Sequence, residues 1–140
     1  MNTDILFSSK TDMWATPQDF YNKLNEEFKF TLDPCALKDN AKCNKYFTPE
    51  DDGLTKDWGG NIVFCNPPYG RDISKWVEKC YNESKKTNTT VVLLIPARTD
   101  TIYFHKFIYK KVKDIRFIKG RLKFGNSKNS APFPSMVVIF

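Results

Sequence analysis

The chain has 140 residues, of which 41% are hydrophobic and 15% aromatic, and this composition excludes an intrinsically disordered protein. A chain of this length can bury about two-thirds of its unfolded surface in one core, so residues 1–140 are expected to form a single domain. No apolar run is long enough to cross a membrane, and the amino terminus lacks the pattern of a signal peptide, so a cytoplasmic protein is expected.

The net charge of +6 is concentrated in one segment. Residues 106–128 contain nine basic side chains and one acid, Asp114, so this segment carries +8 and the rest of the chain −2. The basic residues are Lys106, Lys110, Lys111, Lys113, Arg116, Lys119, Arg121, Lys123 and Lys128. A local excess of this kind favours a face that binds a polyanion, and the simpler alternative is a solvated lysine-rich surface.

Cysteine and histidine are too sparse for a metal centre. The four cysteines, Cys35, Cys43, Cys65 and Cys80, form no C-x-x-C pair, and His105 is the single histidine. A zinc site needs close pairs of ligands, so no metal is expected and the thiols are predicted to be reduced and mostly buried. A nucleophilic triad would depend on His105 alone and is therefore disfavoured.

The first predicted element is a helix. Residues 1–13 are expected to be a weakly ordered lead-in. Thr16 is a natural N-cap and Pro17 fits the first helical position, where a missing N–H costs nothing. An apolar stripe at helical spacing follows in Phe20, Tyr21, Leu24 and Phe28.

Strands and helices then alternate through the middle of the chain. A short strand is predicted over residues 30–33, and the polar segment 35–61 contains one more short strand at 45–47. The apolar run 62–65 predicts a buried strand, and the amphipathic stretch from about Asp72 predicts a helix with Ile73, Trp76, Val77, Cys80 and Tyr81 on one face.

The rest of the chain adds three strands, a helix and a hairpin or loop. The unbroken apolar run 91–95 is typical of a central strand that is buried on both faces. A helix over 100–110, a strand over 114–118, a basic hairpin or loop over 119–134 and a closing strand over 135–140 complete the chain. The alternation favours an α/β domain with a mostly parallel sheet. Since ligands bind beyond the carboxyl ends of such strands, Asp33, Asn66 and Arg98 are expected to line one crevice.

The tetrapeptide Asn66-Pro67-Pro68-Tyr69 lies between the predicted strand 62–65 and the helix that follows it. The Asn66 side-chain oxygen and the Pro67 carbonyl can both accept hydrogen bonds from an exocyclic NH2 group. The two prolines restrict the backbone, and Tyr69 offers a face on which a planar ring can stack. The simpler alternative is a proline-stiffened loop with Tyr69 packed in the core.

Several other segments accompany this motif in a fixed order. They are Trp14-Ala15-Thr16-Pro17, Leu32-Asp33-Pro34-Cys35-Ala36, Asp52-Gly53-Leu54 with Asp57-Trp58, Pro96-Ala97-Arg98-Thr99-Asp100-Thr101, Gly120-Arg121-Leu122-Lys123-Phe124 and Ala131-Pro132-Phe133-Pro134-Ser135. Together with the Asn-Pro-Pro-Tyr segment, this ordered set resembles the small phage-type DNA N6-adenine methyltransferases that use S-adenosylmethionine.

The resemblance implies a Rossmann-like methyltransferase fold with a twisted, mostly parallel sheet and an antiparallel closing strand. Residues 35–61 are too few for the usual elements, so this part of the sheet should be trimmed. The loop from Asp33 to Asn40 has no glycine, which fits a cofactor without a pyrophosphate and argues against NAD or ATP. A bacterial or phage-infected host cell is the implied setting, and a role in restriction-modification or in regulation is left open.

The resemblance also implies site residues. The implied cofactor-binding residues are Trp14, Thr16, Pro17, Asp33, Pro34, Cys35, Asp57 and Asn66. Among these, Asp57 would lie near the cofactor adenine, and Trp14 is a cofactor lid or a packing residue. The ribose acid could be Glu50, Asp51 or Asp52. The catalytic residues would be Asn66, Pro67, Pro68 and Tyr69, with Tyr69 stacking on an adenine flipped out of the duplex.

Contacts with DNA are expected from Arg98, Lys119, Arg121, Lys123 and Lys128, with Arg98 alternatively pairing with Asp100. One alternative function is methylation of a protein glutamine, because the same turn can hold an amide NH2 group. Another is a catalytically inactive DNA-binding partner of the same fold. A homodimer would help a small domain to cover enough DNA, but no decisive interface is evident.

Overall fold

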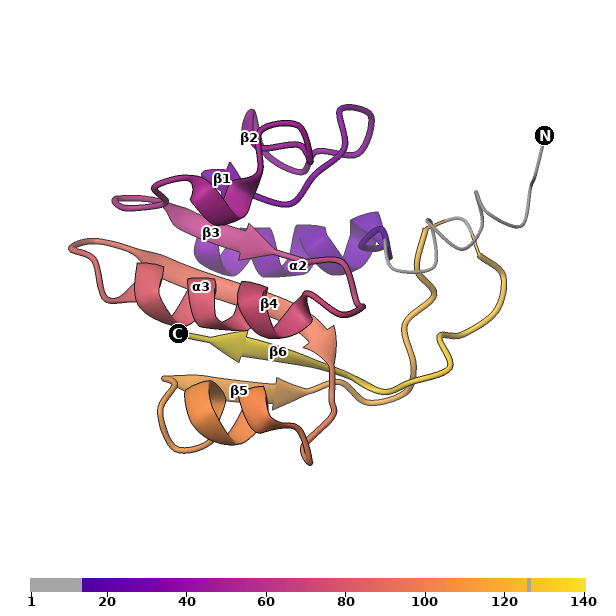
Figure 1. Cartoon of the computed structure of the whole chain (residues 1–140). Helices are drawn as coiled ribbons and strands as arrows, with labels where there is room; N and C mark the ends of the chain where they lie inside the picture. The colour runs from indigo at the N-terminus through magenta and orange to yellow at the C-terminus, as the bar shows by residue number, and fades with distance from the viewer. Residues whose placement is uncertain (1–13, 126) are drawn as a thin grey trace.

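The computed structural model describes residues 14–125 and 127–140 and contains a six-stranded sheet between helices (Figure 1). The strands are β1 (Leu32–Asp33), β2 (Lys45–Tyr46), β3 (Ile62–Cys65), β4 (Thr90–Pro96), β5 (Asp114–Phe117) and β6 (Ser135–Ile139). Their spatial order is β2-β1-β3-β4-β6-β5, and every pairing is parallel except the two that involve β6. The predicted α/β class, with an antiparallel closing strand, is confirmed.

The centre of the sheet is β4, which pairs with β3 on one side and β6 on the other. Its residues 91–95 are fully buried, as the unbroken apolar run predicted. Because β1, β3 and β4 run in the same direction, Asp33 at the end of β1 lies at the same edge of the sheet as Asn66 and Ala97, which directly follow β3 and β4.

Helices cover both faces of this sheet. Helix α2 (Gln18–Phe28) packs on one face, where Tyr21 meets Phe64 of β3 with ring centroids 5.1 Å apart. Helix α3 (Ile73–Ser84) lies on the opposite face and contacts β4, and its Trp76, Val77 and Cys80 are buried (Figure 1). Successive side chains of β3 point to opposite faces of the sheet, so this strand can pack against a helix on each face.

The segment between β1 and β3 is trimmed, as predicted. It holds the two-residue strand β2 and one turn of 3₁₀ helix, η1 (Gly53–Thr55). A Cβ at Gly53 would lie 2.1 Å from the Pro34 carbonyl oxygen, so only glycine lets η1 pack this closely on the loop after β1.

The helix predicted over 100–110 is confirmed over residues 102–108, so it is shorter than predicted and most of it is not α-helical. The regular hydrogen-bonded part is a five-residue π-helix, η2 (Phe104–Ile108), in which the Tyr109 N–H donates to the Phe104 carbonyl at 2.8 Å. It buries Phe104 and Ile108 beside α3, and Lys110 then takes a left-handed conformation that ends the turn.

The segment 119–134 was predicted as a basic hairpin or loop, and its described residues contain no strand. Residues 119–125 and 127–134 form an irregular loop between β5 and β6. One backbone bond crosses it, from the Ala131 N–H to the Leu122 carbonyl at 2.8 Å. Within residues 14–125 and 127–140, no helix is both long and apolar enough to cross a membrane.

Candidate active site

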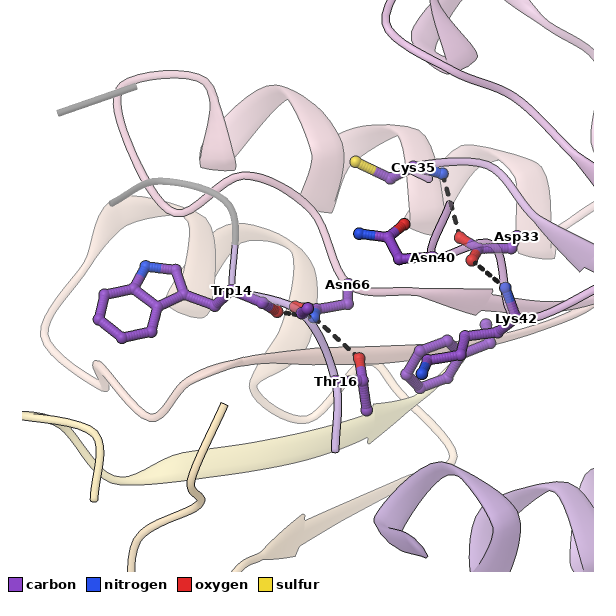
Figure 2. Close-up of a pocket in the computed structure, with 9 residues that line it drawn as sticks. Trp14, Thr16, Asp33, Cys35, Asn40, Lys42 and Asn66 are labelled. Atoms are coloured by element: carbon purple, nitrogen blue, oxygen red, sulfur yellow. Dashed lines mark hydrogen bonds between the residues drawn. The ribbon is translucent and has the colours of Figure 1, made fainter. Parts of the chain in front are cut away.

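Asp33 and Asn66 meet in one cavity at the carboxyl edge of the sheet (Figure 2). Strands β1 and β3 bring these two side chains together, as the parallel arrangement predicted. The cavity is lined by Trp14, Ala15, Thr16, Asp33, Cys35, Asn40, Lys42, Phe64 and Asn66. Arg98 is not part of this lining. It is exposed at the same edge, with its guanidinium carbon 6.0 Å from the centre of the Phe133 ring.

Asp33 has a buried carboxylate that accepts hydrogen bonds from the backbone of the loop that follows it. Its Oδ1 accepts a bond from the Cys35 N–H at 3.3 Å, and its Oδ2 accepts one from the Lys42 N–H at 3.0 Å. Burial raises the pKa of this carboxyl group, and the two backbone donors oppose that shift. The Lys42 side chain also lines the cavity, and burial lowers the pKa of its amine.

The side-chain amide of Asn66 is held from three directions. Its nitrogen donates to the Trp14 carbonyl oxygen and to Thr16 Oγ1, the latter at 2.9 Å (Figure 2). Its oxygen accepts a bond from the Tyr69 hydroxyl. The Leu94 carbonyl lies 3.1 Å from the same hydroxyl and is the second acceptor within reach of its single proton.

The prediction that Thr16 caps the first helix was therefore wrong. Pro17 occupies the N-cap position of α2, and no side chain caps that end. The Thr16 hydroxyl instead bonds to a residue 50 positions away in the chain. Pro17 lines a surface groove with Arg121 and Lys123 rather than the cavity of Asp33.

Tyr69 lies in a cluster of aromatic rings and is only 8% exposed. The Trp14 ring stacks on it with centroids 6.4 Å apart and planes 16° apart, while Phe124 and Phe133 present edges to it. Burial raises the pKa of the Tyr69 hydroxyl, which therefore stays protonated and able to donate. Trp14 thus covers the face that was expected to stack on a base.

A second cavity of about 200 Å³ adjoins the first and shares Cys35 with it. Its lining includes Pro34, Ala36, Asp52, Gly53, Leu54, Pro68 and Trp76. Among the three candidate ribose acids, only Asp52 lines this space. The Asp51 carboxylate instead binds the Thr48 N–H at 3.0 Å, and Glu50 lines neither cavity.

Asp57 is not brought into either cavity. Its exposed carboxylate pairs with the Lys86 amine at 2.8 Å and accepts a bond from the Gly59 N–H. The neighbouring Trp58 is fully buried, stacks on Trp76, and donates from its indole to the Gly53 carbonyl at 3.0 Å. The Asp-Trp pair therefore fixes the turn that supports the second cavity.

The basic segment does not form one face. Lys119, Arg121, Lys123 and Lys128 are exposed in the loop at the edge that holds Asn66. Residues 110–113 precede β5 and lie at the opposite edge, because β5 runs in the same direction as β4 (Figure 1). Between them, both Arg116 amino nitrogens pair with the Glu27 carboxylate, at 2.7 and 2.6 Å.

Sequence reasoning missed several lining residues. Asn40, Lys42 and Phe64 line the first cavity, and Leu54 and Trp76 line the second. Phe64 and Trp76 belong to apolar patterns that predict core positions, so their types gave no functional signal. Lys42 reaches the site because its backbone binds the Asp33 carboxylate, nine residues earlier. Pro67 is buried and lines neither cavity, whereas Pro68 lines the second.

The chain is also similar in sequence to a family of known proteins. Residues 4–140 match the family model described as DNA N-6-adenine-methyltransferase (Dam). The chain is 33% identical over 140 residues to a DNA N-6-adenine-methyltransferase of Haemophilus phage HP1, covering 94% of this chain and 80% of that protein. It is 35% identical over 96 residues to the protein of that name in Escherichia phage T1, covering 66% of this chain and 39% of the relative.

Proposed function

The chain belongs to the DNA N-6-adenine-methyltransferase family, and on that premise we propose that it transfers a methyl group from S-adenosylmethionine to N6 of adenine in DNA. The observation that carries the proposal is the meeting of Asp33 and Asn66 in one cavity at the carboxyl edge of the sheet. This meeting supports a cofactor site at Asp33 with an acceptor for an amine, Asn66, beside it.

The two adjoining cavities fit this cofactor by their chemistry. The Lys42 amine supplies a positive charge for a carboxylate, and the Asp33 carboxylate suits an ammonium group in the same cavity. In the second cavity, Asp52 can accept bonds from ribose hydroxyls, and Leu54, Pro68 and Trp76 offer apolar contacts for a planar ring. When bound, the cofactor supplies an electrophilic methyl group on a sulfonium.

Asn66 and Pro67 provide the acceptors for the amine. The adenine N6 lone pair is delocalised into the ring, which makes this nitrogen a poor nucleophile. Acceptors aimed at both of its N–H bonds favour a pyramidal nitrogen and stabilise the positive charge that develops during attack. Pro67 follows directly after Asn66, so its carbonyl belongs to the same rigid turn. Once the nitrogen is methylated, its extra proton leaves to water.

The target base must leave the duplex to reach this turn. A base that stacks on Tyr69 takes the place of the Trp14 ring, which now lies 6.4 Å from it. Trp14 comes from the short segment before α2, and this segment touches the basic loop through a bond from the Gly125 N–H to the Ala15 carbonyl at 2.8 Å. Displacement of Trp14 would therefore also disturb the contact between this segment and the loop.

Backbone attraction to DNA comes from the loop at the same edge. Lys119, Arg121, Lys123 and Lys128 are exposed there, and Arg98 lies at the rim of the aromatic cluster. Flexible exposed cations suit phosphate contacts, which supply affinity that is independent of sequence.

The test is direct. Purified protein is incubated with S-adenosylmethionine carrying a labelled methyl group and with DNA from a methylase-deficient host, and the digested nucleosides are analysed by mass spectrometry. The expected product is labelled N6-methyldeoxyadenosine, and sequencing of the treated DNA then gives the target position. Labelled methylcytosine, or no labelled nucleoside together with labelled glutamine in an added protein, would contradict the proposal.

A further inference from the structure

Within the described part of the protein, the hydrogen bonds of the Asn66 side chain leave one of its acceptor positions unoccupied. A side-chain amide has two N–H donors and an oxygen with two lone pairs. Both donors are used within the protein, one by the Trp14 carbonyl and one by Thr16 Oγ1. One lone pair of Oδ1 is used by the Tyr69 hydroxyl. What remains is a single acceptor site on Oδ1.

This arrangement also fixes which way the amide points. The Trp14 carbonyl has no hydrogen, so it can face only the nitrogen of the amide. The Tyr69 hydroxyl has its proton to donate and is in reach of two acceptors, Asn66 Oδ1 and the Leu94 carbonyl. A rotated amide would place Oδ1 against the Trp14 carbonyl, which is electrostatically unfavourable.

An aspartate at this position would need no partner to fix its orientation, because its two oxygens are equivalent. An asparagine does need one, because its nitrogen can donate to a carbonyl just as its oxygen can accept from an amine. Thr16 is the one side chain among the described residues that occupies an Asn66 donor, and it is 5% exposed. It approaches from the segment before α2, on the side of the amide nitrogen (Figure 2).

We propose that Thr16 is a specificity-determining positioning residue: its hydroxyl occupies an Asn66 N–H so that the amide can only accept from the target base. A base with an amino group at position 6 satisfies the free lone pair of Asn66. A base with a carbonyl there, such as hypoxanthine, meets an acceptor and leaves both groups unpaired. The inference rests on the proposed function and deepens it, since it assigns the choice of a 6-amino base to a residue outside the Asn-Pro-Pro-Tyr turn.

The test compares two bases in one duplex. Duplexes carry adenine or hypoxanthine at the position mapped by sequencing, and their affinities are measured with S-adenosylhomocysteine present. Wild-type protein is expected to prefer adenine. In Thr16→Val, which keeps the shape and loses the hydroxyl, the preference should fall by about tenfold, because one N–H becomes free to donate to the carbonyl of hypoxanthine. Thr16→Ser, which keeps the hydroxyl, should restore most of it.

The outcomes separate this inference from the proposed function. If wild-type protein methylates no adenine, the proposed function fails. If it methylates adenine while Thr16→Val keeps the full wild-type preference, only the role of Thr16 fails. A general loss of packing would weaken both duplexes equally and leave the preference unchanged, which also counts against Thr16.

A measurement on the wild-type protein avoids any question of folding in the variant. The Asn66 side-chain NH2 signals are assigned in a ¹⁵N spectrum by their loss in Asn66→Ala. Their exchange with solvent should be slower than that of the exposed Asn82 side chain, because both Asn66 protons are bonded within the protein. Equal exchange rates would overturn the inference.

Discussion

The turn 66–69 and the loop 119–134 lie at the same edge of the sheet and are built in opposite ways. In the turn, each polar group of the Asn66 and Tyr69 side chains has a partner, and Tyr69 is nearly buried. In the loop, the basic side chains are exposed, and among its described residues Phe124, Ala131 and Phe133 are buried. Groups that must meet a reacting atom are fixed by packing, whereas charges that attract a polyanion can remain mobile.

The two regions nevertheless meet in one cluster. Phe124 and Phe133 of the loop pack on Trp14 at centroid distances of 5.6 and 5.1 Å, and both also contact Tyr69. We therefore expect single substitutions in the turn to have large effects on the chemical step, and single substitutions in the loop to have small effects on binding that depend on salt.

The largest expected effect is that of Asn66→Ala. This change removes the proposed acceptor for the amine and should lower the single-turnover rate by about 10²–10³-fold. Binding of S-adenosylmethionine, measured by isothermal titration, should stay within a few-fold of wild type, since Asp33, Lys42 and the second cavity are intact. A rate close to that of the wild type would remove Asn66 from the site.

Tyr69→Phe should have a smaller effect on the same step. The ring and its aromatic contacts remain, and the bond from the hydroxyl to Asn66 Oδ1 is lost. We expect the rate of methyl transfer to fall by about tenfold with little change in KM for DNA. Tyr69→Ala is the matched contrast, because it also removes the stacking surface and should raise KM. Equal KM values in the two variants would contradict a stacking role.

A single charge in the loop should matter less. Lys123→Gln is expected to weaken DNA binding a few-fold and to reduce the slope of log affinity against log salt by about 0.9. The single-turnover rate at saturating DNA should be unchanged, because Lys123 is exposed and lines the surface groove beside Pro17 and not either of the two cavities.

Lys111→Gln is the matched control for that change. It removes the same charge from the same basic segment, but at the opposite edge of the sheet. Its salt slope on a short duplex that contains one target should equal that of the wild type. A reduction as large as that of Lys123→Gln would mean that the whole segment binds DNA as one face, contrary to the structure.

The smallest expected effect is a pH dependence of stability from Asp33. Burial raises the pKa of this carboxyl group above 3.8, so folding favours its protonated form. Its contribution to the free energy of unfolding is fully present at low pH and is lost as the pH rises through the raised pKa. In denaturant titrations, the stability of the wild type relative to Asp33→Asn should therefore decrease from about pH 3 to about pH 7. An increase over that range would contradict the assignment.

Much of the fold could be predicted because its signals are local. The run 62–65 gave β3 at its observed bounds, and the apolar stripe after Asp72 gave α3. The segment 100–110 shows the limit of this approach. A helix does form within it and buries Phe104 and Ile108, but the local sequence did not predict that most of this helix is π-helical or that it contacts α3.

The positions of site residues could be predicted only where those residues lie at the end of a strand. Asp33 and Asn66 meet because parallel strands end at one edge, and this follows from the order of elements. The bond from Asn66 to Thr16 joins positions 50 residues apart, and the charge pattern gave no sign that β5 carries its basic neighbours to opposite edges. Such contacts depend on tertiary packing, which no local pattern encodes. The cytoplasmic location and a homodimer stay predictions.

The central claim is that Asn66 receives a hydrogen bond from the 6-amino group of the target base. It is tested most directly by removing each partner in turn: Asn66→Ala in the protein, and purine in place of adenine at the mapped position of the duplex. Affinities are measured for all four combinations with S-adenosylhomocysteine present. The account predicts that wild-type protein prefers adenine over purine by about tenfold and that Asn66→Ala shows no preference. An undiminished preference for adenine in Asn66→Ala would contradict it.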